Sequence, residues 1–275
     1  MKFLTFVNYA YIDIVHNLYL QLKKFNRHKD LIITCTDDET KIKLIQQIQN
    51  CECEILQYQP VLFKETLSNY QSHLSDKNYA ATHLKSASYS IYQFLKHDVL
   101  YQNLIKHESV CLLDADIIVF EDFVDPLMYW MNNNKKFKYS DPTLFGFKYY
   151  LQGRICVDIN KKESLYHWSG REQVINTGFL YLRINDITIK HLIDYTKLFV
   201  PHFGQINNLD EFILTEYFRN VDENITSIPD QINLVSNVGT VYSPEEVLKL
   251  KPMTFHPTFT GNKIQFMKDC KQWLL

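Results

Sequence analysis

Residues 110–120, Val-Cys-Leu-Leu-Asp-Ala-Asp-Ile-Ile-Val-Phe, place two acidic side chains inside an otherwise apolar run. The apolar residues before the acids predict a strand over 110–113 that is covered on both faces, because such strands are continuously hydrophobic. Asp114 and Asp116 follow this strand. Two carboxylates at this spacing can converge on one cation, and Mg²⁺ and Mn²⁺ prefer oxygen ligands. On these residues alone, a solvated turn at the strand end is the alternative.

Apolar runs and segments of helical period alternate on both sides of this stretch. Strands are predicted at 3–7, 31–35, 53–56 and 179–182. Helices are predicted at 15–25, 42–48, 79–105, 187–199 and 210–218. This alternation predicts an α/β fold, in which helices flank a mostly parallel, doubly wound sheet.

We expect one domain over residues 1–275, since no Gly-, Ser- or Pro-rich stretch marks a linker. The helix at 79–105 is expected to break near His97 and Asp98. Residues 132–173 show no clear period and predict a long loop or small insertion.

The net charge of −2 leaves no basic excess, so a nucleic acid is not an expected partner. The six cysteines lack the paired spacing of a zinc site, and we expect reduced thiols and a cytoplasmic protein. No apolar run approaches the ~18 residues of a transmembrane segment.

Three motifs, in order along the chain, resemble those of GT-A nucleotide-sugar glycosyltransferases, that is, the glycogenin-like enzymes and related nucleotide-diphospho-sugar transferases. The strand followed by Asp-Ala-Asp (114–116) resembles their metal-binding DxD. Val-Ile-Asn-Thr-Gly-Phe-Leu-Tyr-Leu-Arg (174–183) resembles their Asn-Thr-Gly strand, and Phe-His-Pro-Thr-Phe-Thr-Gly-Asn-Lys-Ile (255–264) their His…Gly…Lys segment. The resemblance covers about residues 3–273, with 132–173 unmatched, and implies the GT-A (Rossmann-like) fold. The unmatched region would lie on the acceptor side. Its aromatic side chains suit stacking on an acceptor sugar, although a chain with 14 % aromatic residues also forms such clusters without a function.

The resemblance also implies a metal site and a donor site. Asp114, Asp116 and His256 would bind Mn²⁺ or Mg²⁺, although a lone histidine is often structural. The donor-binding residues would be Asn8, Tyr9, Asp37, Lys85, Asp114, Ala115, Thr177, Gly178, Gly261 and Lys263. Lys263 would bind diphosphate as a point charge, and Tyr9 would stack on the base. Asp37 and Lys85 are explained equally well as a turn residue and a solvated lysine.

Asn176, Asp210 and Glu211 are the implied catalytic residues. The glycogenin-like enzymes usually carry Asp-Gln where this chain has Asp210-Glu211, so Glu211 departs from the pattern. A carboxylate there would face the anomeric carbon and stabilise an oxocarbenium-like centre. The first turn of a helix also favours an acidic residue without any catalytic role.

The implied function is a metal-dependent hexosyltransferase. It would move a sugar from a nucleotide diphosphate, by default uridine diphosphate, to a glycan, protein or small-molecule acceptor with retention. Two alternatives stay open. One is a non-catalytic nucleotide-sugar-binding protein of the same fold. The other is a phosphatase of the haloacid-dehalogenase kind, whose DxD usually lies near the N-terminus.

Overall fold

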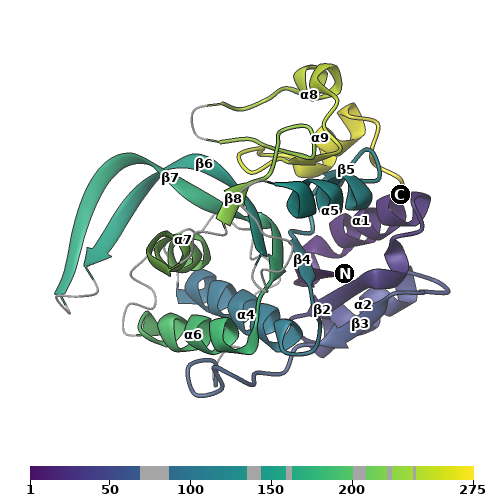
Figure 1. Cartoon of the computed structure of the whole chain (residues 1–275). Coiled ribbons are helices and arrows are strands. Elements are labelled where there is room, and N and C mark those ends of the chain that lie inside the picture. Colours follow the sequence, from purple (N-terminus) through teal and green to yellow (C-terminus); the bar gives the residue numbers. More distant parts are fainter. Residues whose placement is uncertain (69–86, 135–143, 159–162, 201–208, 222–224, 238–239) are drawn as a thin grey trace.

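The computed structural model describes residues 1–68, 87–134, 144–158, 163–200, 209–221, 225–237 and 240–275 (Figure 1). The strands are β1 (Lys2–Val7), β2 (Leu31–Cys35), β3 (Glu54–Gln57), β4 (Val110–Leu113), β5 (Ile118–Val119), β6 (Leu144–Asp158), β7 (Glu163–Arg183), β8 (Ile225–Ser227), β9 (Asn233–Val235) and β10 (Thr254–His256). The helices are α1 (Ile12–Lys24), α2 (Asp38–Gln47), α4 (Ala87–Leu104), α5 (Val124–Asn133), α6 (Asp186–Lys197), α7 (Leu209–Val221), α8 (Pro244–Leu250) and α9 (Lys263–Asp269), with 3₁₀ turns η1 (Tyr9–Tyr11) and η2 (His28–Asp30).

A seven-stranded sheet in the order β3-β2-β1-β4-β7-β6-β8 forms the centre of the described structure. Strands β3, β2, β1 and β4 are parallel, β7 is antiparallel to both β4 and β6, and β8 is parallel to β6. The predicted α/β architecture with a mostly parallel sheet is confirmed. A second sheet has the order β5-β10-β9.

Alternate side chains of β1 enter two separate cores, as expected for a strand covered on both faces. Phe3 and Val7 pack with residues of α1, α2, α5, α8 and α9. Leu4 and Phe6 pack with residues of α4, α6 and α7. Figure 1 shows α5 and α9 on one side of the sheet and α4, α6 and α7 on the other. Because β1 pairs in parallel with both β2 and β4, the carboxyl ends of these three strands lie together at one edge of the sheet.

Helix α4 is continuous through residues 97 and 98, so the predicted break there is wrong. Asp98 is fully buried but has hydrogen-bond donors around it. Its carboxylate accepts the Tyr58 hydroxyl and, at 3.0 Å each, the backbone N–H groups of Val61 and Leu62. The acidic residue thus anchors the segment after β3 to α4. Residues 79–86 of the predicted helix lie outside the described part.

Strands β6 and β7 form a long antiparallel pair that extends away from the rest of the molecule (Figure 1). The loop predicted within 132–173 is therefore wrong for residues 144–158 and 163–173. Register shifts between Gly146 and Lys148, Gly153 and Ile155, and Cys156 and Asp158 break the two-residue period that would have revealed these strands. Two expectations stay predictions: that residues 132–173 form an insertion on the acceptor side, and that the chain is one domain.

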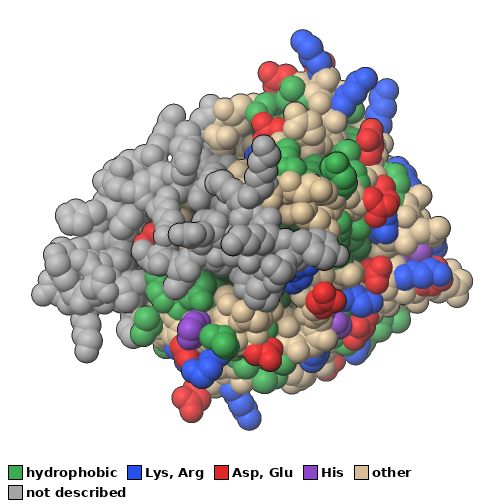
Figure 2. Space-filling view, in the orientation of Figure 1, with side chains coloured by type: hydrophobic (Ala, Val, Ile, Leu, Met, Phe, Trp, Pro, Cys, Tyr) green, Lys and Arg blue, Asp and Glu red, His purple; other side chains and the backbone are tan. Residues whose placement is uncertain are grey.

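Acidic and basic side chains are interspersed over the described part of the face in Figure 2, as the small net charge implies. Among the described residues, no helix has both the length and the apolar character needed to cross a bilayer. The cytoplasmic location stays a prediction.

Candidate metal and donor site

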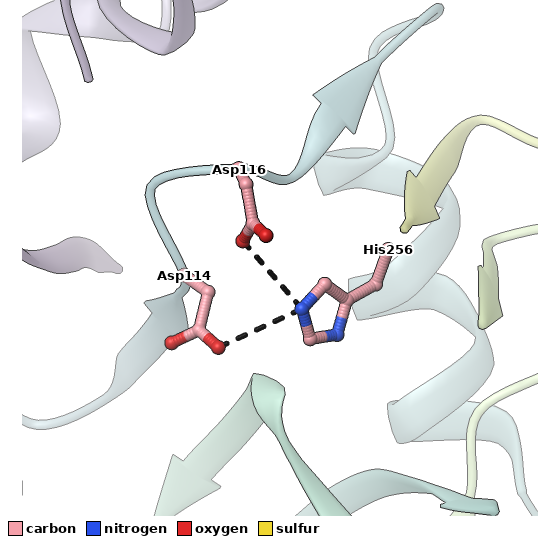
Figure 3. A group of neighbouring side chains, drawn as sticks. All are labelled: Asp114, Asp116 and His256. Atoms are coloured by element: carbon pink, nitrogen blue, oxygen red, sulfur yellow. Dashed lines mark ion pairs between the residues drawn. The ribbon is translucent and has the colours of Figure 1, made fainter. Parts of the chain in front are cut away.

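Asp114, Asp116 and His256 meet beyond the carboxyl end of β4 (Figure 3). His256 Nε2 lies 3.6 Å from Asp114 Oδ2 and 3.5 Å from Asp116 Oδ1. Asp116 and His256 are buried, while Asp114 is partly exposed. One ligand atom from each residue lies within 4.8 Å of the others, so the three could hold one metal ion.

The small second sheet brings His256 to the two aspartates. Strand β5 begins two residues after Asp116, and β10 pairs with it antiparallel, with Phe255 opposite Ile118. His256 follows Phe255 at the end of β10. A short strand pair therefore joins segments that are far apart in the sequence.

Asn176 fixes the orientation of the His256 ring. Asn176 Oδ1 accepts the backbone N–H of Gly178 at 3.2 Å and lies 2.8 Å from His256 Nδ1. Because an amide oxygen only accepts, His256 Nδ1 carries a hydrogen and donates it to Asn176, which leaves Nε2 facing the two carboxylates. Metal-bound histidines commonly donate their second N–H in this way, so the donor set fits a divalent cation.

Two lysines pair with the carboxylates of this cluster. Lys263, at the start of α9, pairs with Asp116, and Lys96 of α4 lies 2.8 Å from Asp114 Oδ1. Burial acts to raise the pKa of Asp116, but Lys263 holds it well below its ordinary value. Burial acts to lower the pKa of Lys96, but Asp114 and Asp210 raise it above its ordinary value. Asp116 and Lys96 are therefore both charged at neutral pH.

Lys96 also joins the cluster to α7, and the sequence analysis missed it. Its Nζ lies 3.2 Å from Thr177 Oγ1 and 3.4 Å from Asp210 Oδ2. The lysine expected near the donor, Lys85, lies outside the described residues. The sequence signal that could have identified Lys96 is a lysine among the apolar residues of the predicted helix.

Asp210 and Glu211 lie in the first turn of α7, and both are buried. Asp210 Oδ1 accepts Gln93 Nε2 at 3.1 Å, and Asp210 Oδ2 accepts Thr177 Oγ1 at 2.7 Å. Both carboxylate oxygens of Asp210 thus hold the surrounding segments together. Glu211 lies close enough to Lys96 to raise the lysine pKa further. The catalytic role of Glu211 stays a prediction.

The segment after β1 faces the Asp114–Asp116–His256 site through Tyr11, a residue that the sequence analysis did not select. Burial raises the pKa of Tyr11; Lys263 acts in the opposite sense, while Asp116 and Asp114 raise it further. Tyr9 is exposed. Asn8 is buried, and its Oδ1 has no hydrogen-bond partner in the described part of the chain.

Asp37 is accounted for as the N-cap of α2. Its carboxylate accepts the Thr40 N–H at 2.8 Å and the hydroxyls of Thr36 and Thr40 at 2.7 and 3.0 Å. Ala115 is buried between the two aspartates. Gly261 is exposed, and a β-carbon built on it meets no atom within 4 Å. Contacts of Asp37, Ala115 and Gly261 with a donor stay predictions.

No protein-family model and no curated protein sequence matches the chain. Solved structures match along its whole length. Mouse xyloside xylosyltransferase 1 in its apo form superposes with a TM-score of 0.51 at 9 % identity, over 94 % of this chain and 97 % of that one. The galactosyltransferase LgtC, bound to donor and acceptor sugar analogues, superposes with a TM-score of 0.53 at 11 % identity. This match covers 100 % of this chain and 97 % of LgtC.

The chain has a GT-A glycosyltransferase fold. The glycosyltransferase GlyE of Streptococcus pneumoniae TIGR4 has the same fold, with a TM-score of 0.53 and 13 % identity. The match covers all of this chain and 60 % of GlyE. The predicted GT-A fold is thus confirmed. At these identities the likeness concerns the fold, and the chemistry must be argued from the residues of the site.

Proposed function

We propose that the protein is a glycosyltransferase that uses Mn²⁺ or Mg²⁺ to transfer a sugar from a uridine diphosphate donor to an acceptor hydroxyl, with retention. The observation that carries the proposal is the meeting of Asp114, Asp116 and His256 in a GT-A fold. Their place at the carboxyl edge of the parallel strands is where ligands bind in open α/β sheets.

Asp114, Asp116 and His256 Nε2 would hold the cation, because carboxylate oxygens and a neutral imidazole are ligands that Mn²⁺ accepts. When bound, the cation stabilises the negative charge on the departing nucleoside diphosphate. Lys263 would add a second positive charge at the diphosphate. Lys263 lies at the start of α9 beside Asp116, so it would be near the diphosphate oxygens that the cation binds.

The residues around Lys96 would bind the transferred sugar. Lys96, Thr177 and Asp210 form one buried hydrogen-bonded group next to Asp114. Asn176 is buried as well, and its Nδ2 has no partner among the described residues, so it can donate to a sugar oxygen. Glu211 would place a negative charge near the anomeric carbon as positive charge develops there.

The nucleotide would lie against the segment after β1. The buried Asn8 Oδ1 can accept an N–H of the base. The exposed ring of Tyr9 offers a stacking surface, and Tyr11 lies on the side of the candidate metal site, near Asp114 and Asp116. The acceptor, whether glycan, protein or small molecule, would reach the sugar from outside this segment.

A donor-hydrolysis assay with matched binding measurements tests the proposal. We expect uridine diphosphate and Mn²⁺ together to raise the melting temperature more than either alone, because ligands that bind only the folded state stabilise it. A uridine diphosphate sugar should be hydrolysed slowly, and only with the metal. Binding without any turnover across a panel of sugars would indicate a non-catalytic nucleotide-sugar-binding protein. A protein that is neither stabilised by uridine diphosphate with Mn²⁺ nor able to hydrolyse the donor would contradict the proposal. The phosphatase alternative finds no support in the GT-A fold.

A further inference from the structure

Outside the metal site, two thiols face each other in the turn between α2 and β3. Cys51 Sγ lies 3.0 Å from Cys53 Sγ, and both residues are partly exposed. We propose that Cys51 and Cys53 form a modification site, a dithiol that a small-molecule disulfide oxidises to a disulfide within this turn. The proposed sugar transfer does not use either residue.

The turn is held so that the two thiols stay together. Asn50 adopts a left-handed conformation, with φ 54°, and directs the chain back toward β3. The intervening Glu52 is bound from the outside: its carboxylate lies 2.9 Å from His28 Nε2 and 3.0 Å from Lys29 Nζ. The hydrogen bond from His28, followed by that from Lys29, lowers the pKa of Glu52 to about 2. Glu52 is thus ionised and anchored at neutral pH.

Both cysteines, in contrast, pack against the main apolar core. The fixed residue between them and the core behind them leave the sulfur atoms few ways to separate. A reaction between two groups held in contact has a large advantage over attack by a second molecule from solution. A mixed disulfide on one cysteine is therefore expected to close onto the other.

Oxidation proceeds by two thiol–disulfide exchanges. One of the two cysteines attacks one sulfur of the small disulfide, breaks its S–S bond and releases one thiol. The other cysteine then attacks the sulfur of the first, breaks the mixed disulfide and releases the second thiol. The two released thiolates take the two cysteine protons, so the dithiol is oxidised as the small disulfide is reduced.

The reaction should be selective for this pair. Cys35, Cys111 and Cys270 are fully buried. Burial raises the pKa of Cys35 to about 12 and that of Cys270 to about 11. Buried thiols of this kind are inert while the protein stays folded. The side chain of Cys156 lies outside the described residues, so the modification must be assigned by peptide.

Trypsin provides that assignment, because residues 44–64 contain Cys51 and Cys53, no other cysteine, and no internal Lys or Arg. The folded protein is treated with glutathione disulfide, alkylated and digested. We expect this peptide to carry no alkyl group and to be about 2 Da lighter than the reduced, unalkylated peptide, and we expect dithiothreitol to reverse the change. In Cys53→Ser and in Cys51→Ser, the peptide should instead keep one glutathione on the remaining cysteine.

A wild-type peptide that stays reduced, or that ends with a stable glutathione adduct, would overturn the proposal. Melting curves of both variants establish that they are folded, and the corresponding alanine variants replace any that is not. The readout needs neither metal nor donor, so its result is separate from that of the proposed function.

Discussion

A β-carbon added at Gly178 would overlap Cε1 of the His256 ring. The imidazole ring therefore packs directly on the backbone of the Asn-Thr-Gly segment, where Asn176 also accepts its Nδ1–H at 2.8 Å. One motif thus positions the histidine of another. The glycine is required by this close approach, because any larger residue would fill the space that the ring occupies.

Gly178→Ala should displace His256 and weaken Mn²⁺ binding by about 10- to 100-fold, as is typical when groups that orient a metal ligand are lost. Isothermal titration with Mn²⁺ measures the effect. Gly261→Ala is the matched control, since a β-carbon there meets no atom within 4 Å. Equal metal affinity in the two variants would show that the ring position does not depend on Gly178.

Lys96→Met should lower the free energy of unfolding by roughly 3 kcal/mol, because it leaves Asp114 and Asp210 without their shared buried cation. Urea unfolding measures the change. Lys190→Met removes an exposed pair with Asp194 instead and should change stability by less than about 1 kcal/mol. If the two variants lose the same stability, Lys96 does not have the central electrostatic role assigned to it.

Glu211→Gln tests the residue at which this chain departs from the glycogenin-like pattern. The substitution keeps the shape but removes a charge that matters as positive charge develops, so kcat should fall by about tenfold or more while KM changes little. A first-turn helix acid would instead cost only ~0.3–1 kcal/mol of stability. Glu216→Gln, on the same helix, is the kinetic control. Parental turnover in a slightly destabilised Glu211→Gln would remove the catalytic assignment.

His97 predicts a pH dependence of folding. Burial lowers its pKa from 6.5 to about 4, so the folded state binds its proton less readily than the unfolded state. Stability should therefore fall as the pH drops from about 6.5 to about 4, by roughly 3 kcal/mol from this residue. Urea unfolding of wild type and His97→Gln at several pH values isolates the contribution. Parallel pH profiles for the two proteins would contradict it.

The sequence predicted those parts of the site that follow from local pattern. The apolar run over 110–113 with two acids after it predicted a buried strand, which is β4, and the two carboxylates that lie next to His256. Lys96 could not be found in the same way, because its partners Asp114 and Asp210 come from distant segments and a helical lysine ordinarily faces solvent. Strands β6 and β7 were missed because their register shifts interrupt the alternation of side chains.

The central claim is that Asp114, Asp116 and His256 hold a divalent cation that the nucleotide donor requires. Calorimetric titration of uridine diphosphate in the presence and absence of Mn²⁺, for wild type and Asp116→Asn, measures it most directly. We predict that Mn²⁺ strengthens binding to wild type at least tenfold, about 1.4 kcal/mol or more, and has no effect on Asp116→Asn. Binding to wild type that is independent of Mn²⁺, or an Asp116→Asn protein with the full metal dependence, would contradict the account.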